Sequence, residues 1–241
     1  MTMGSAIAAA TSYQRRRAAL ESYFDRTAAD AWARLTTDAP VSGIRATVRA
    51  GRDEIRSALL SWLPEDLHGR RILDAGCGTG MLAFEAARRG AEVVAIDLAG
   101  SLVSVARERM PADLDAASIR FEVGDMLDPA LGRFDHVVGM DSLIHYNVAD
   151  ITRVLGTLAE RTNDSIVFTF APRTAVLATM HAVGKLFPRS DRAPAIEPVA
   201  VGRITRHIGD APALADWNVG RTQRVNRGFY ISQALELVHA R

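Results

Sequence analysis

Residues 74–80 of the chain read Asp74-Ala75-Gly76-Cys77-Gly78-Thr79-Gly80. The apolar residues 72–73 precede this stretch, and the apolar residues of 81–89 that follow it recur at helical spacing. The glycines therefore occupy a turn between a buried strand and a helix, where the absence of side chains lets a ligand approach the backbone. We predict that this loop binds a nucleotide-like ligand and follows the first strand of an α/β sheet.

Strand and helix patterns alternate on the C-terminal side of the loop. Such alternation is typical of right-handed βαβ crossovers, and hence of a doubly wound, mostly parallel sheet. We expect an antiparallel pair at 217–225 and 228–238 to complete a seven-stranded sheet. The other expected strands are 72–75, 91–97, 119–123, 134–139 and 165–170, and the expected helices are 81–89, 101–109 and 149–161.

The chain extends beyond this core in two places. Helical spacing at 12–35 and 44–62 predicts an all-helical N-terminal segment, with the three arginines 15–17 on its solvent side. A second segment, after the fifth strand, contains an expected amphipathic helix at 174–187. We interpret residues 1–241 as a single domain, with 1–65 as a helical lid, 70–170 and 215–241 as the core sheet, and 171–214 as a substrate-side insertion.

Composition argues against several classes of protein. The 241 residues carry a formal net charge of +1 and are 48% hydrophobic, as expected of a globular protein with a buried core. A charge near zero disfavours a general binder of nucleic-acid backbones. No apolar run approaches the ~20 residues that span a bilayer, and the apolar stretch 6–10 is too short for a signal peptide, so we expect a cytoplasmic protein. The single cysteine and the lack of clustered Cys and His residues predict no protein-bound metal.

The spacing of the glycines separates two cofactor classes. Dinucleotide-binding loops read G-x-G-x-x-G, whereas the third glycine here comes one residue earlier. Asp74 would repel a pyrophosphate but can accept a hydrogen bond from an ammonium group. Both features favour S-adenosylmethionine, which has an amino group and no phosphate. The loop resembles the first motif of class I S-adenosylmethionine-dependent methyltransferases, a Rossmann-like family.

Two further acids follow the next two expected strands. Asp97 lies 21 residues after Gly76, where a carboxylate can bind both ribose hydroxyls. Asp125 lies in a segment resembling the motif whose carboxylate meets the adenine amino group while the next backbone N–H meets the ring. Each acid alone is equally well explained as the cap of a βα turn, but the loop and all three acids together favour a cofactor site. The expected cofactor contacts are Asp74, Gly76, Cys77, Gly78, Asp97, Leu98, Asp125, Met126 and Met140.

Cys77 and the residues after the fourth strand bear on the chemistry. We expect Cys77 to present its backbone to the ligand, because methyl transfer needs no protein nucleophile. Four parts of the chain together resemble the magnesium-protoporphyrin IX O-methyltransferases of chlorophyll and bacteriochlorophyll synthesis. They are Tyr23-Phe24-Asp25 with Trp32, the segment 44–52, the glycine loop, and the segment from Met140 to Tyr146. The resemblance covers most of the chain. It implies esterification of a propionate of magnesium protoporphyrin IX to the monomethyl ester, with S-adenosylhomocysteine as by-product and magnesium present only within the substrate.

The resemblance also suggests site residues on the acceptor side. Tyr23 and His145 are candidate catalytic residues: Tyr23 would close over the cofactor, and His145 would position the propionate or approach the magnesium face. Packing of Tyr23 against its aromatic neighbours and a structural role for His145 are the alternatives. In the insertion, Arg173, Lys185 or Arg189 would pair with the second propionate, unless its helix packs on the sheet edge or in a dimer.

Expected partners and alternative functions complete the interpretation. Docking to the magnesium chelatase that makes the substrate is one candidate association, and the amphipathic helix of the insertion is a candidate for weak contact with the photosynthetic membrane. The alternatives are methylation of another small lipophilic acceptor, such as a quinone precursor or a fatty acid, a nicotinamide-dependent oxidoreductase, and a subunit that binds the cofactor without catalysis. The glycine spacing and Asp74 oppose the oxidoreductase, and the intact set of acids opposes a dead site.

Overall fold

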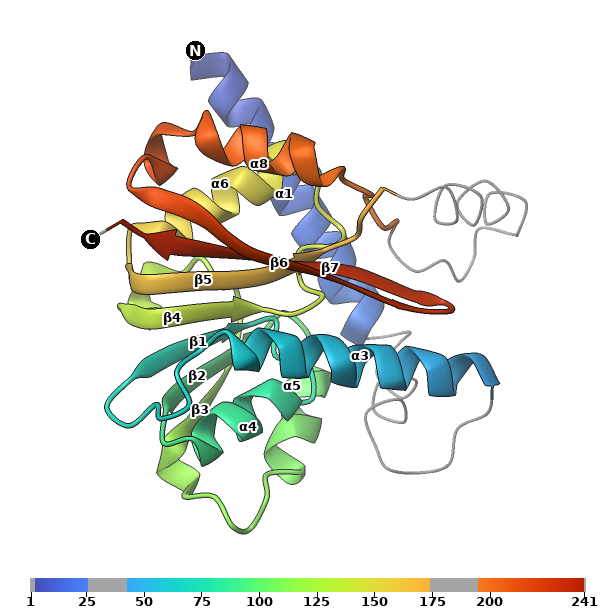
Figure 1. Ribbon diagram of the computed structural model, residues 1–241, viewed down its shortest axis with the longest axis vertical. Helices are drawn as coiled ribbons and strands as arrows, with labels where there is room; N and C mark the ends of the chain where they lie inside the picture. The colour runs from blue at the N-terminus through green and yellow to red at the C-terminus, as the bar shows by residue number, and fades with distance from the viewer. Residues whose placement is uncertain (1–2, 26–42, 174–194, 241) are drawn as a thin grey trace.

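A computed structural model of the protein describes residues 3–25, 43–173 and 195–240. Its strands form one seven-stranded sheet in the order β3-β2-β1-β4-β5-β7-β6 (Figure 1). The first five strands are parallel, and β7 runs antiparallel to both β5 and β6. This confirms the predicted doubly wound, mostly parallel sheet. The strands are β1 (Arg71–Ala75), β2 (Glu92–Asp97), β3 (Ile119–Val123), β4 (Phe134–Gly139), β5 (Thr162–Phe170), β6 (Trp217–Arg227) and β7 (Tyr230–His239).

Helices cover both faces of the sheet. In Figure 1, α1, α6 and α8 lie on one side, and α3, α4 and α5 lie on the other. Each side has its own apolar cluster, the first containing Leu155 and Phe168 and the second containing Leu59 and Phe84. The helices are α1 (Met3–Tyr23), α3 (Gly43–Ser61), α4 (Met81–Arg88), α5 (Gly100–Glu108), α6 (Val148–Ala159) and α8 (Val201–Gly209), with short 3₁₀ turns at Ala116–Ser118, Pro129–Leu131 and Pro212–Leu214.

The strand order creates a crevice at the end of β1. This strand is flanked by β2 on one side and by β4 on the other, so the crossover helices leave it in opposite directions. Ligands of open α/β sheets bind at such switch points, beyond the carboxyl ends of the strands. Ile72 and Leu73 are fully buried because helices cover both faces of β1, which explains why the strand reads as an uninterrupted apolar run.

Two expectations for the flanking segments need correction. Arg15 is exposed as expected, but Arg16 and Arg17 are only partly exposed, because they form ion pairs with Glu197 at 3.0 Å and with Asp125 at 2.7 Å. The insertion contains a helix, α8, that the sequence interpretation left out. The helix expected at 174–187 lies outside the described residues.

Candidate functional site

The glycine loop lies tightly against the segment that follows β4. The backbone N–H groups of Gly76 and Cys77 both donate to the carbonyl of Ile96, at 2.8 and 3.0 Å, which ties the loop to β2. Gly76 has a φ of 90°, and a Cβ atom there would lie 2.4 Å from the Cβ of Ser142. Glycine is therefore required at 76 both by the backbone conformation and by the close approach of Ser142.

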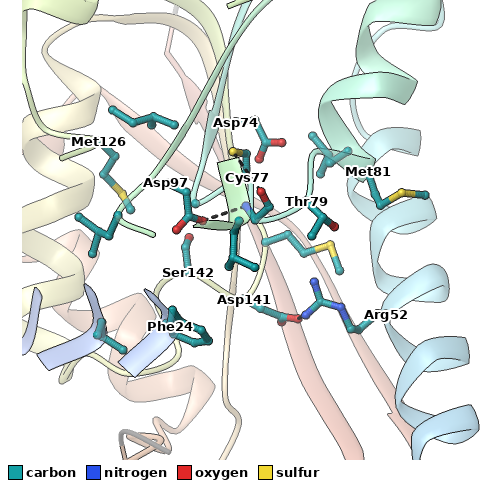
Figure 2. A pocket seen from close by; sticks show the side chains of 18 of the residues that line it. Phe24, Arg52, Asp74, Cys77, Thr79, Met81, Asp97, Met126, Asp141 and Ser142 are labelled. Atoms are coloured by element: carbon teal, nitrogen blue, oxygen red, sulfur yellow. Dashed lines mark hydrogen bonds and ion pairs between the residues drawn. The ribbon is translucent and has the colours of Figure 1, made fainter. Parts of the chain in front are cut away.

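A cavity of about 240 Å³ lies at the crevice, bounded by the loops after β1, β2 and β4 and by α1 and α3 (Figure 2). Leu20 lines it from α1, Phe24 lines it from the residue after that helix, and Arg49, Arg52 and Arg56 line it from α3. The structure thus brings the predicted cofactor residues into one site. Eight of the nine line the cavity, namely Asp74, Gly76, Cys77, Gly78, Asp97, Leu98, Met126 and Met140.

Asp74 is the most unusual residue of the cavity. Its side chain is buried, and Oδ2 has no hydrogen-bond partner within the described chain; the same is true of the buried hydroxyl of Ser142, which also lines the cavity. Burial raises the pKa of the Asp74 carboxyl to about 7, and the nearby Asp97 carboxylate adds to the shift. The Ala83 N–H donates to this carboxylate, but a buried carboxylate oxygen without a donor is still costly. The site therefore fits a ligand with an ammonium group, which would supply the missing donor.

Asp97 organises the loop and still has acceptor capacity. One carboxylate oxygen accepts a hydrogen bond from the Gly78 N–H at 2.8 Å, and the other accepts from the Ala99 N–H at 2.9 Å. Burial raises the pKa of Asp97, and these hydrogen bonds partly offset the shift. A carboxylate oxygen can accept two hydrogen bonds. Asp97 can therefore hold the loop and bind ligand hydroxyl groups at the same time.

Asp125 is the predicted cofactor residue that does not line the cavity. One of its oxygens accepts from the Tyr13 hydroxyl at 2.8 Å and from the Leu127 N–H at 2.9 Å, while the other pairs with Arg17. The carboxylate therefore faces α1, although its neighbours Gly124 and Met126 line the cavity. In this arrangement the loop offers the ligand its backbone, and Asp125 anchors the N-terminal helix.

The surroundings of Cys77 suppress its reactivity. Burial raises the pKa of the thiol well above its usual range, and the carboxylates of Asp97 and Asp74 raise it further. Because the thiolate is the nucleophilic form, this cysteine stays protonated and inert near neutral pH. Its position in the loop is that of a small residue whose backbone lies beside the ligand.

The two candidate catalytic residues lie in different places. His145 is buried and lines the cavity, with Nδ1 3.3 Å from the carbonyl oxygen of Ala195 and its ring edge-on to Phe24. Tyr23 is half-buried beside Phe24 and is not among the cavity-lining residues. The structure thus brings Phe24, rather than Tyr23, next to His145. Arg173 is exposed, and Lys185 and Arg189 lie outside the described residues.

The sequence interpretation missed the contribution of α3. Arg49, Arg52 and Arg56 follow an i, i+3, i+7 spacing, which places them on one face of the helix, and that face meets the cavity. Arg56 pairs with Glu85 at 2.7 Å and with Asp53 at 2.9 Å, and Arg52 pairs with Asp141 at 2.6 Å. The spacing was visible in the sequence, but it does not by itself indicate which face of a helix a ligand meets.

Two other features bear on the kind of protein this is. Over residues 3–25, 43–173 and 195–240, no three His, Cys, Asp or Glu residues gather as metal ligands would. Within the same ranges, none of the helices combines the length and apolarity required to cross a bilayer.

Comparisons with known proteins place this geometry in context. Two family models match the chain, magnesium-protoporphyrin IX methyltransferase C-terminus over residues 139–239 and methyltransferase domain over residues 72–164. The magnesium-protoporphyrin O-methyltransferase of Rhodobacter capsulatus is 53% identical over 227 residues, which cover 94% of this chain and 98% of that one. The crystal structure of magnesium protoporphyrin IX methyltransferase from Synechocystis PCC 6803 with bound SAH superposes with a TM-score of 0.81 at 27% identity, covering 93% of this chain and 99% of that one.

A third relative is similar over a shorter part of the chain. The ubiquinone biosynthesis O-methyltransferase of Alkalilimnicola ehrlichii is 42% identical over 80 residues, which amount to 33% of this chain and 32% of that one. The similarity to a quinone-precursor enzyme therefore does not extend over the whole chain.

Proposed function

The chain belongs to the magnesium-protoporphyrin O-methyltransferase family, and on that premise we propose that it transfers the methyl group of S-adenosylmethionine to a propionate carboxylate of magnesium protoporphyrin IX in (bacterio)chlorophyll biosynthesis. The observation that carries this assignment is the 53% identity to an enzyme of that name over nearly the whole of both chains. The family predicted from the sequence is thereby confirmed.

The cavity residues fit S-adenosylmethionine group by group. Asp74 would accept from the ammonium group, because its Oδ2 is buried and lacks a donor. Asp97 would accept from the ribose hydroxyls, and the backbone of the glycine loop would lie along the ligand. The backbone at Gly124 and Met126 would meet the adenine. Leu98, Cys77 and Met140 would complete the enclosure.

The chemistry asks little of the protein beyond positioning. When bound, S-adenosylmethionine supplies an electrophilic methyl group on a cationic sulfur. The propionate, with a reference pKa of about 4.3, is already ionised at neutral pH, so no general base is needed. A carboxylate oxygen forms the new O–C bond as the S–C bond breaks, and no proton moves. The protein's task is to hold the acceptor oxygen in line and to keep water away.

We propose that His145 positions the acceptor carboxylate and that Tyr23 approaches the site as the N-terminal lid closes. His145 already lines the cavity, and the ring of Phe24 packs edge-on against it and adds an apolar surface to the cavity wall. The lid proposed for residues 1–65 would act from two sides, because α1 and α3 bound the cavity from opposite faces of the sheet. The insertion 171–214 would cover the macrocycle.

Variants at these two positions test the catalytic roles. We expect His145→Ala and Tyr23→Phe to lower kcat at least tenfold while changing the Kd for S-adenosylhomocysteine less than threefold, a rough separation expected for groups that act on the acceptor. Steady-state kinetics and calorimetry measure the two quantities. An unchanged kcat in both variants would remove the catalytic assignment.

Product analysis with competing acceptors tests the substrate. The purified protein is incubated with S-adenosylmethionine and an equimolar mixture of magnesium protoporphyrin IX and a demethylated quinol. Mass spectrometry then measures the molecular masses of both acceptors. We expect one methyl group on the porphyrin and none on the quinol. Methylation of the quinol alone would replace the proposed substrate.

Association with other components is proposed on the chemistry of the substrate. A flat, largely apolar macrocycle is poorly soluble, so handover from the magnesium chelatase and weak contact of an otherwise cytoplasmic protein with the photosynthetic membrane would both ease its delivery. Co-sedimentation with vesicles and co-purification with the chelatase, each compared with and without porphyrin, measure these associations.

A further inference from the structure

Asp141 has a backbone conformation that is unusual for its residue type. Within the described ranges, it is the one non-glycine residue with a positive φ, at 57°. It lies two residues after the end of β4 and lines the cavity, and its side chain is 9% exposed. Residues held in sparsely populated backbone regions persist when their surroundings fix them, and they gather at functional sites. The backbone conformation of Asp141 therefore indicates that this residue has a functional role at the cavity.

Side chains from three elements converge on this residue. Tyr230 of β7 donates its hydroxyl to the Asp141 carboxylate, 3.0 Å from each oxygen. Thr169 of β5 accepts from the Asp141 N–H at 2.7 Å. Arg52 of α3 donates from Nη1 to Oδ2 at 2.6 Å, as Figure 2 shows at the edge of the cavity. The carboxylate thus joins α3 to the sheet beside the ligand site.

The position of α3 is set independently at the neighbouring residue. A Cβ atom at Gly51 would lie 2.4 Å from Cδ1 of Tyr230, so the lack of a side chain lets the helix lie directly on that ring. Tyr230 therefore contacts both the backbone before Arg52 and the carboxylate that pairs with Arg52. This arrangement fixes the guanidinium more firmly than an isolated ion pair would, because two contacts orient the same helical turn.

Building on the proposed function, we propose that Arg52 binds the carboxylate of a ligand in the cavity and that Asp141 is the positioning residue that holds its guanidinium there. A guanidinium has five N–H donors in a planar fork, so a group that donates to Asp141 through Nη1 can also bind a second carboxylate. Arg52 is favoured over Arg56 because Asp141 and Tyr230 fix its helical turn beside the cavity, whereas Arg56 pairs with Glu85 and Asp53. Two ligands offer this chemistry, the amino-acid end of the cofactor and the propionates of the porphyrin.

A binding experiment tests the first source. Calorimetry compares S-adenosylhomocysteine with 5′-methylthioadenosine, which lacks the amino-acid end, on the wild type, on Arg52→Met and on the control Arg45→Met, an exposed position of the same helix. If Arg52 binds the cofactor carboxylate, Arg52→Met weakens S-adenosylhomocysteine about 10- to 100-fold, the loss expected for a charge-assisted pair. The Kd of methylthioadenosine should change less than twofold in Arg52→Met, and the control Arg45→Met should leave the Kd of both ligands unchanged.

The second arm uses the acceptor. Absorbance titrations compare magnesium protoporphyrin IX with its dimethyl ester on the same variants. If Arg52 binds a propionate, Arg52→Met weakens the binding of the diacid about 10- to 100-fold and leaves the binding of the diester unchanged. If neither S-adenosylhomocysteine nor the diacid is weakened, the proposal is overturned. Failure of the wild type to methylate the porphyrin overturns the proposed function instead, and the first arm still measures the role of Arg52.

A double-mutant cycle tests the role of Asp141. A positioning residue acts through Arg52, so Asp141→Asn should weaken the same carboxylate-bearing ligand, and Arg52→Met/Asp141→Asn should bind it no more weakly than Arg52→Met alone. Binding of methylthioadenosine should stay within twofold. Additive losses, or equal losses for ligands with and without the carboxylate, would show a structural role and overturn the positioning assignment.

Discussion

At the scale of single residues, the site depends on groups whose native surroundings are unfavourable without a ligand. The Asp74 carboxyl is buried without a donor for Oδ2, and its pKa is raised to about 7 by burial and by Asp97. In the unfolded chain the same group ionises near 4. The ligand-free fold therefore binds a proton that the unfolded chain does not bind between these values, and its stability falls as the pH rises from about 4 to about 7.

Replacing this carboxylate should affect stability and binding in opposite directions. We expect Asp74→Asn to stabilise the ligand-free protein above pH 7 by about 2–4 kcal/mol, because it removes the cost of a buried charge, and to weaken S-adenosylhomocysteine binding at least tenfold. Urea denaturation at pH 8 and calorimetry measure the two effects. A loss of stability at pH 8 would contradict the account of Asp74.

The same group predicts the pH dependence of cofactor binding. An ammonium group beside Asp74 favours the ionised carboxylate, so the pKa falls on binding and a proton is released at pH values below about 7. The affinity for S-adenosylhomocysteine should therefore decrease by up to tenfold per pH unit below 7 in the wild type and be flatter in Asp74→Asn. Calorimetry in buffers of different ionisation enthalpy counts the protons, and an equally steep decrease in both proteins would assign it to another group.

Gly76 offers a second test at this scale. Gly76→Ala would place a Cβ atom 2.4 Å from that of Ser142 at a φ of 90°. We expect a loss of at least about 2 kcal/mol in the free energy of unfolding, and more than tenfold weaker cofactor binding. Gly202→Ala in α8 is the matched control, because nothing lies within 4 Å of the added atom. Alanine should be neutral or slightly stabilising at this helical position. Equal stability of both variants would be inconsistent with the close approach of Ser142.

The site residues that could be predicted from the sequence are those placed by interactions between residues close together in the chain. The glycine loop and the acids at 74 and 97 belong to single strand-turn units, so their placement follows once the strands are assigned. The partners of Asp125 could not be predicted in this way. Its carboxylate pairs with residues of α1 that lie more than 100 positions earlier, and nothing in either segment indicates the other.

At the scale of elements, α1 is held to the core by polar contacts with the cofactor-side loop. The Tyr13 hydroxyl and the Arg17 guanidinium both bind Asp125, the Tyr13 ring stacks on Tyr146, and Ser12 donates to Asp150. The helix therefore docks on Asp125, the residue that was expected to bind the adenine amino group. Movements of α1 and occupancy of the adenine end of the cavity should consequently be coupled.

Weakening this docking should loosen α1. We expect Tyr13→Phe to cost about 1 kcal/mol, and Arg17→Met to cost less, because Arg17 is partly exposed and solvent screens its ion pair. Hydrogen exchange of the α1 amides should accelerate in the double variant and be unchanged in the control Gln14→Ala, an exposed position on the same helix. Slow exchange in the double variant would mean that apolar contacts alone dock the helix.

Elements with a strong period were predicted well, and short ones were not. The boundaries of β3 and β4 agree with the expected strands 119–123 and 134–139. In β4, which lies between β1 and β5, nearly every residue is buried, whereas in the edge strand β3 only Ile119 and Phe121 are buried. The helix α8 was missed, since it has nine residues and buries only Ile204 and Ile208 after a proline-rich stretch. Its helical state depends on packing against α6, which the sequence does not display.

At the scale of the whole molecule, topology decides where the ligand binds. The switch point between β1 and β4 collects acids and glycines from separate strands at one edge of the sheet, and α1 and α3 bound the resulting cavity. This arrangement followed from the alternation of strands and helices. The row of arginines that α3 presents to the cavity did not, because it depends on how a helix outside the βαβ units packs on β6 and β7.

The central claim, methyl transfer to a propionate oxygen, is tested most directly with an isotopically labelled methyl group. Magnesium protoporphyrin IX and its dimethyl ester are incubated separately with the protein and with S-adenosylmethionine carrying a ¹³C methyl group, and the products are examined by mass spectrometry and carbon NMR. The account predicts one labelled methyl ester on the diacid and no label on the diester. Label on the diester, or none on the diacid while S-adenosylhomocysteine still binds, would contradict it.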